Sequence, residues 1–141
     1  MHTKVVVTRK MTVSAATVWN AVSAIGRLDV WFPSLLDCDV QGIGVGAVRT
    51  MTAVRGGQIV DHIVAVDYDC RRLTYDRVKS PFPVSSYTGN VEVFTSFDGL
   101  GVIVWTVDFE STPDDAPTVR RRLEAAIGDG VEGMRDELAA R

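Results

Sequence analysis

The chain has 141 residues, with 46% hydrophobic and 23% charged side chains, and this composition is typical of a folded protein with an ordinary core. Its formal net charge is −3 and no basic stripe is visible, so the sequence argues against a nucleic-acid groove. No apolar run approaches 18 residues and residues 1–4 lack the apolar core of a signal peptide, so we expect a cytoplasmic protein without a membrane span.

The first part of the chain predicts one strand and two short helices. Residues 4–13 are rich in Val and Thr, as strands are. Ser14 can accept a hydrogen bond from the first turn of the helix that follows, and Gly26 is the expected end of that helix. Residues 28–32 predict a second short helix, because Pro33 cannot continue it.

Beyond Pro33 the apolar residues change to the two-residue period of β-strands. A Gly-rich corner lies at 42–46, and Gly56-Gly57 and residues 98–101 predict hairpin turns. The expected strands are residues 36–41, 47–55, 58–66, 72–79, 86–97 and 102–110. With the first strand, they make six or seven strands at hairpin spacing, which predicts one antiparallel meander.

The last part of the chain predicts one long amphipathic helix. Pro117 and the acidic residues before it suit a helix N-terminus. The apolar positions that follow form one stripe: Leu123, Ala126, Ile127, Val131, Met134 and Leu138. A large antiparallel sheet has an apolar face to cover, and this helix is the natural cover. We therefore expect an α+β fold in which a curved antiparallel sheet wraps around the C-terminal helix.

Three glycines, Gly128, Gly130 and Gly133, lie inside this helical pattern. Each costs about 1 kcal/mol relative to Ala in a helix interior. Two explanations remain open. The helix either breaks at residues 128–130, or it is thinned there so that space remains between it and the sheet, which would favour an internal cavity.

Two charged residues alternate with apolar neighbours on adjacent predicted strands. Arg49 and Asp61 would both be buried if these strand faces point inward, and a buried cation needs a counter-charge. That counter-charge is either Asp61 itself, which would satisfy both groups without a ligand, or an anionic group of a ligand. A surface position for Arg49 is the remaining alternative.

Large aromatic residues are the other candidates for a pocket. In the core they would only fill volume, whereas in a pocket they would supply apolar area, with a polar tip on each Trp and Tyr. Alternate residues of the last strand, Trp105 and Phe109 among them, share one face, which we take as inward. The candidate ligand-binding residues are Trp31, Arg49, Asp61, Tyr75, Tyr87, Trp105, Phe109, Ile127 and Met134.

Signals for catalysis or metal binding are weaker. Asp61 and His62 are candidates for acid–base catalysis, but adjacent strand residues point to opposite faces. The chain has no nucleophile elbow, phosphate loop or metal-ligand spacing, so we expect no metal and no organic cofactor. Cys38 and Cys70 are expected to be reduced thiols, buried or half-buried, in a reducing compartment.

Several short segments follow one another at a particular spacing: WFP at 31–33, GVGAVR at 44–49, IVDHIVAVD at 59–67, RLTY at 72–75, FPVSSY at 82–87 and DGLGVIVW at 98–105. In this order they resemble the START-like (SRPBCC) helix-grip superfamily, and within it the polyketide cyclase/dehydrase branch. The resemblance covers nearly the whole chain. It implies a sheet of six to seven strands around the C-terminal helix, two short helices after the first strand, and an apolar cavity. Asp61 stands where the best-defined members keep an acidic residue on the fourth strand.

Members of this superfamily bind lipids, polyketides, hormones or other hydrophobic molecules, and some are cyclases or dehydratases. The sequence therefore predicts a single START-like ligand-binding domain over residues 1–141, present as a monomer or homodimer. Its expected partner is a hydrophobic or amphipathic small molecule, such as a lipid, polyketide or aromatic metabolite, bound between sheet and helix.

Two alternative functions remain. A cyclase or dehydratase would use Asp61 or His62 as acid or base, with Arg49 or Tyr75 holding an enolate, and would bring two titratable groups together in one pocket. A protein-interaction module would instead show a contiguous exposed apolar patch and a closed interior.

Overall fold

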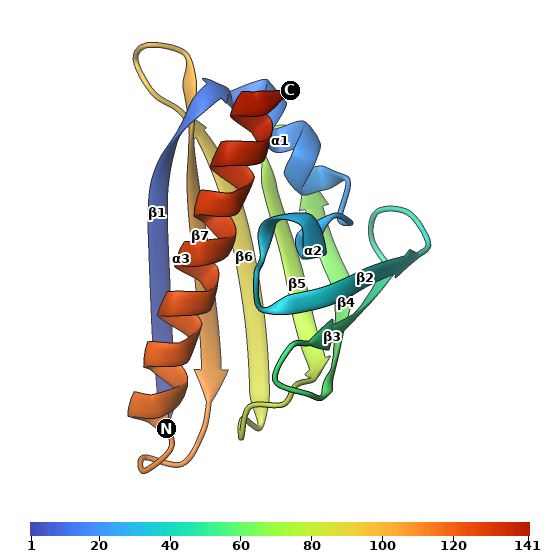
Figure 1. Cartoon of the computed structure of the whole chain (residues 1–141), viewed down its shortest axis with the longest axis vertical. Helices are drawn as coiled ribbons and strands as arrows, with labels where there is room; N and C mark the ends of the chain where they lie inside the picture. The colour runs from blue at the N-terminus through green and yellow to red at the C-terminus, as the bar shows by residue number, and fades with distance from the viewer.

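Seven antiparallel strands form one curved sheet in the order β1-β7-β6-β5-β4-β3-β2 in a computed structural model that describes residues 1–141 (Figure 1). The strands are β1 (His2–Ser14), β2 (Leu35–Gln41), β3 (Val48–Ala53), β4 (Gln58–Asp67), β5 (Arg72–Lys79), β6 (Ser86–Thr95) and β7 (Leu100–Glu110). The helices are α1 (Ala15–Ser23), α2 (Leu28–Trp31) and α3 (Ala116–Ala140). The predicted α+β helix-grip fold is confirmed, with seven strands and two short helices after β1.

The long helix α3 covers the sheet on the side of β1, β7 and β6, and α2 lies between α3 and the strands of the other end (Figure 1). The predicted inward face of β7 is correct, since Ile103, Trp105, Val107 and Phe109 are all buried. None of the helices combines the length and the hydropathy that crossing a bilayer requires.

Helix α1 begins as the sequence predicts but ends earlier. The hydroxyl oxygen of Ser14 accepts a hydrogen bond from the backbone N–H of Thr17 at 3.2 Å. The predicted end at Gly26 is wrong, because the helix stops at Ser23. The turn into α2 is made by Ile25 and Arg27, both with a φ of 71°, rather than by the glycine between them. Tertiary contacts hold these two residues in the left-handed region, which local sequence preference disfavours.

Helix α3 is continuous from Ala116 to Ala140, so the predicted break at residues 128–130 does not occur. The thinned-helix explanation is wrong for two of these glycines, because α2 and the adjoining Phe32 fill the space beside them. A Cβ on Gly130 would collide with the ring of Phe32, and one on Gly133 would collide with the backbone carbonyl of Trp31. These glycines therefore allow α2 to approach α3 closely instead of leaving a void.

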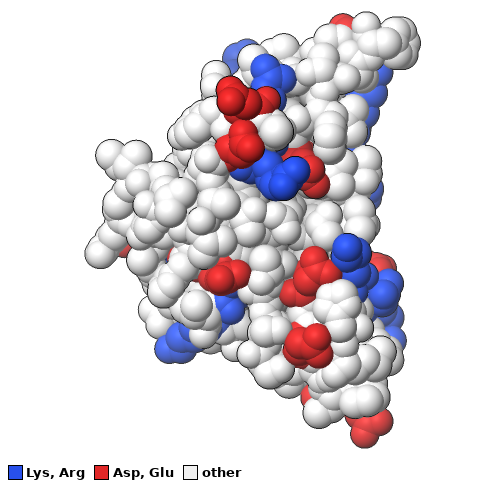
Figure 2. All heavy atoms as spheres, turned by 180° about the vertical axis from the view of Figure 1, so that it is seen from behind, with Lys and Arg blue, Asp and Glu red and all other residues white.

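Figure 2 shows the face of the molecule opposite to that in Figure 1. Acidic and basic side chains are interspersed there over a mostly uncharged surface. Ion pairs between exposed or half-exposed side chains include Arg72 with Glu92 and Lys10 with Asp98. No continuous basic stripe is visible on this face. Of the two cysteines, Cys38 is half-buried but Cys70 is exposed, so the prediction for Cys70 is wrong; neither forms a disulfide.

Candidate ligand-binding site

A cavity of about 700 Å³ lies between the sheet, α2 and α3. Its volume falls within the range of about 300–1,000 Å³ that is usual for small-molecule sites. Fourteen of its 21 lining residues are hydrophobic, and none is Asp or Glu. The cavity is thus mostly apolar, has no acidic residue in its lining, and lies where α3 crosses the curved sheet.

The cavity has an aromatic inner wall and a mouth of exposed residues. Tyr75, Tyr87 and Trp105 line it from β5, β6 and β7, and all three are buried. At the mouth, the guanidinium of exposed Arg122 lies 4.8 Å from the ring centroid of Phe82. The β3–β4 hairpin (54–56) and the 81–82 turn also line the cavity at this end of the sheet.

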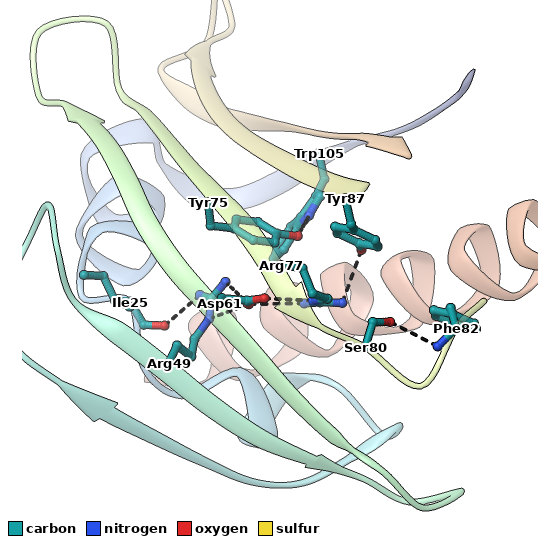
Figure 3. Close-up of polar contacts among 9 residues, drawn as sticks. All are labelled: Ile25, Arg49, Asp61, Tyr75, Arg77, Ser80, Phe82, Tyr87 and Trp105. Atoms are coloured by element: carbon teal, nitrogen blue, oxygen red, sulfur yellow. Dashed lines mark hydrogen bonds and ion pairs between the residues drawn. The ribbon is translucent and has the colours of Figure 1, made fainter. Parts of the chain in front are cut away.

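Three charged residues lie side by side on adjacent strands, next to the tyrosines of the aromatic wall (Figure 3). Register pairs Arg49 of β3 with Asp61 of β4, and Asp61 with Arg77 of β5. The Asp61 carboxylate accepts four N–H···O hydrogen bonds at 2.8–3.2 Å, two from each arginine. Its side chain is fully buried, and those of Arg49 and Arg77 are 3% and 10% exposed. We call these three residues the Arg–Asp–Arg cluster.

The Arg–Asp–Arg cluster keeps its charges at neutral pH. Burial alone would raise the pKa of Asp61, but Arg77 and Arg49 outweigh it and hold that pKa below its ordinary value. Burial alone would lower the pKa of Arg77, but Tyr87 and Asp61 outweigh it and raise that pKa. Two cations and one anion give the cluster a net charge of +1.

Arg49 has a structural contact in addition to its ion pair. Its Nη1 donates to the backbone carbonyl of Ile25 at 3.0 Å and so ties β3 to the turn between α1 and α2 (Figure 3). The inward position of Arg49 and its pairing with Asp61 are both confirmed. Because Asp61 and Arg49 satisfy each other, the pair itself needs no ligand.

The hydroxyls of the two tyrosines belong to one hydrogen-bonded group with Trp105 and Arg77 at the cavity wall. Trp105 Nε1 donates to Tyr75 Oη at 3.1 Å, and Arg77 Nη1 donates to Tyr87 Oη at 3.3 Å (Figure 3). The guanidinium of Arg77 also lies over both rings, 5.5 Å and 4.5 Å from their centroids. Burial raises the pKa of Tyr87 well above its ordinary value, so this phenol keeps its proton.

The nine candidate residues divide into those that line the cavity and those that lie outside its lining. Tyr75, Tyr87, Trp105 and Ile127 line it. Arg49 and Asp61 are buried and are not among the lining residues. The other three candidates, all buried in the core away from the lining, are Trp31, Phe109 and Met134. His62 is exposed on the opposite face of β4 from Asp61.

Arg77 is the site residue that sequence reasoning missed. It follows Leu73 and Tyr75 at two-residue spacing, and this alternation alone was enough to place it on the inward face of β5. The pairing of Arg77 with Asp61 could not be predicted from the sequence, because the register of β4 against β5 shifts on both sides of Asp61. The shifts lie between Val60 and Asp61 and between Ile63 and Ala65. Such irregularities re-aim side chains near sites.

Gly89→Ala should displace Tyr75, since the two residues are opposite each other and a Cβ on Gly89 would collide with the tyrosine ring. We expect a loss of about 1–3 kcal/mol in the free energy of unfolding, as for other overpacked cores. Urea denaturation measures it. In a Tyr75→Leu background the same change should cost clearly less; an equal cost in both backgrounds would show that the ring is not the obstacle.

Comparison with known proteins places this geometry in context. The family model described as polyketide cyclase/dehydrase and lipid transport matches residues 2–139. Among curated proteins no match was found.

Solved structures share the fold over nearly the full chain. A protein from Thermobifida fusca solved by NMR is 26% identical, with 97% of this chain and 93% of its own covered, and a TM-score of 0.78. An uncharacterized protein from Bacillus thuringiensis is 18% identical over 99% of both chains, with a TM-score of 0.83. Norcoclaurine synthase from Thalictrum flavum is 17% identical, with 99% and 86% covered and a TM-score of 0.79. At 17–18% identity, the last two similarities show the fold alone.

Proposed function

The chain belongs to the polyketide cyclase/dehydrase and lipid transport family, and from this premise we propose that it binds a hydrophobic or amphipathic small molecule between the sheet and α3. Proteins of this family usually bind hydrophobic ligands. The observation that carries the proposal is the cavity of about 700 Å³, two-thirds of whose lining residues are hydrophobic.

The driving force would be removal of apolar ligand surface from water, at about 25 cal/mol per Å². Polar groups at the inner wall would orient the ligand, as few and fixed polar groups do in other sites. Tyr75, Tyr87, Trp105 and Ile127 are the predicted ligand-binding residues that the lining supports. We add Arg77 to them.

Binding is better supported than proton-transfer catalysis. His62 lies outside the cavity, and Asp61 is fully buried beneath two arginines that keep it ionised. Arg77 and Tyr87 do meet inside the cavity, but the pKa of each is raised, so both act as hydrogen-bond donors at neutral pH. The lining therefore offers donors and no group poised to accept a proton near pH 7.

An interaction module of the same fold is less well supported, because it predicts a closed interior and this one holds a cavity with an exposed mouth. We propose that residues 1–141 act as one ligand-binding domain, as a monomer or homodimer, in the cytoplasm. Cysteines that form no disulfide with each other fit that compartment.

Ala126→Trp tests the proposal by filling the cavity from α3. The environment-sensitive neutral dye N-phenyl-1-naphthylamine should bind the native chain. It should bind the variant roughly tenfold more weakly, which corresponds to losing about 60 Å² of apolar contact. Fluorescence titration measures both affinities. Ala139→Trp, on an exposed residue near the end of the same helix, is the control and should bind as the native chain does. Equal affinity in all three proteins would place the dye outside the cavity.

A further inference from the structure

The charged side chains that line the cavity are all positive. Three arginines line it, Arg55, Arg77 and Arg122, and no carboxylate does. Asp61, the acid nearest to Arg77, is fully buried and belongs to the Arg–Asp–Arg cluster, whose net charge is +1. A ligand in this cavity therefore meets positive charge that the protein does not neutralise.

Arg77 has hydrogen-bonding capacity left over. A guanidinium carries five N–H donors. Two are taken by the Asp61 carboxylate and one by Tyr87 Oη, so two N–H groups have no partner in the protein. The side chain is only 10% exposed and lines the cavity, so those donors are available to a molecule inside it.

The two tyrosines add one more donor at the same place. Tyr87 Oη accepts from Arg77, Tyr75 Oη accepts from Trp105, and the two hydroxyls also hydrogen-bond to each other. One phenolic proton is used between them, and the other has no partner in the protein. A guanidinium edge flanked by two phenols matches the two oxygens of a carboxylate, because a carboxylate accepts hydrogen bonds and donates none.

We propose that the ligand is an apolar monocarboxylate, with its carboxylate bound by Arg77 and Tyr87 and its apolar body directed toward the mouth. This inference rests on the proposed function and specifies its ligand class. A single negative charge would neutralise the net charge of the Arg–Asp–Arg cluster, whereas a cationic head group would meet repulsion and a neutral one would leave the excess charge uncompensated.

The head group belongs at the inner wall rather than at the mouth. Arg55 and Arg122 are exposed, so water and salt screen their charges, and Arg122 already packs against Phe82. Arg77 is nearly buried, and charge-assisted hydrogen bonds are stronger where water is excluded.

The test compares probes that differ only in the head group. Dodecanoate is paired with dodecan-1-ol and dodecylamine, and 2-naphthoate with 2-naphthalenemethanol, so that aliphatic and aromatic acids are distinguished. Affinities are measured at pH 7 by displacement of N-phenyl-1-naphthylamine. In at least one pair the acid should bind about tenfold or more tightly than its alcohol, which is the effect of one or two charge-assisted hydrogen bonds. Dodecylamine should be the weakest aliphatic probe.

Variants locate the head group. Arg77→Met should remove the preference for the acid, and its fold should survive because Asp61 keeps Arg49 as partner. Tyr87→Phe, which deletes only one hydroxyl, should reduce the preference in part. Arg72→Met is the matched control: it makes the same charge change on the outward face of β5 and should leave the preference intact.

The outcomes separate this inference from the proposed function. If alcohols and acids bind equally, or if Arg77→Met keeps the preference for the acid, the inference is overturned but the cavity remains a binding site. If no probe displaces the dye and Ala126→Trp does not change the affinity for the dye, both proposals are overturned.

Discussion

Asp61→Asn should lower the free energy of unfolding by about 3–5 kcal/mol, the cost of removing one partner from a buried ion pair. Asp61 is the only anion between Arg49 and Arg77, and its carboxylate accepts four of their N–H groups. An asparagine is nearly the same size but would leave two cations facing each other in the interior. Urea denaturation of the native chain and the variant measures the difference.

The control for this variant is Asp69→Asn, the same substitution in an exposed turn, which should change stability by less than about 0.5 kcal/mol. A similarly small loss for Asp61→Asn would mean that the cluster is not held together by this carboxylate. It would also weaken the argument that positive charge at the inner wall is fixed in place.

At acidic pH, the difference in the free energy of unfolding between the native chain and Asp61→Asn should disappear. The pKa of Asp61 in the folded chain lies below its ordinary 3.8, so its contribution to stability is fully present above that value and is lost as the pH falls through the folded pKa. We expect the stability gap between the native chain and Asp61→Asn to shrink between pH 5 and about pH 2. A gap that stays constant over this range would show that protonation of Asp61 does not matter.

The same substitution at two glycines of α3 should have opposite effects. Gly133→Ala should cost about 1–3 kcal/mol, because its Cβ would press against the backbone carbonyl of Trp31, which cannot swing aside as a side chain can. Gly128→Ala should stabilise by about 0.5–1 kcal/mol, since its Cβ would meet only Arg9 Nη2 at an ordinary 3.6 Å and alanine favours the helix.

Thermal unfolding of both variants beside the native chain decides the role of the glycines. Opposite shifts in melting temperature support close packing of α2 on α3 at Gly133. If both variants gain stability, α2 does not sit against α3 as described, and the wall that α2 gives to the cavity is in question.

The fold was predictable because the local sequence patterns are consistent with the packing of the whole chain. Ser14 at the end of a Val-rich strand, the glycine pair at 56–57 and the apolar stripe of the last 25 residues each predict one element, and these elements have one natural packing. The ends of elements were less predictable. Helix α1 ends before Gly26 because Ile25 is held in the left-handed region, where Arg49 binds its carbonyl.

The site was predictable only in part, for a physical reason. Strand parity placed Tyr75, Tyr87 and Trp105 on the inner face, but parity does not say how deep along a strand the cavity runs. Phe109 has the same parity as Trp105 and lies in packed core instead. The glycines of α3 misled for a related reason, since a missing side chain indicates close approach as readily as it indicates space.

The most direct test of a binding cavity between sheet and α3 is an experimental structure of this chain determined with saturating dodecanoate. The account predicts the alkyl chain between β5–β7 and α3, with its carboxylate within hydrogen-bond distance of Arg77. An interior closed by side chains, with the probe absent or bound on the outer surface, would contradict it.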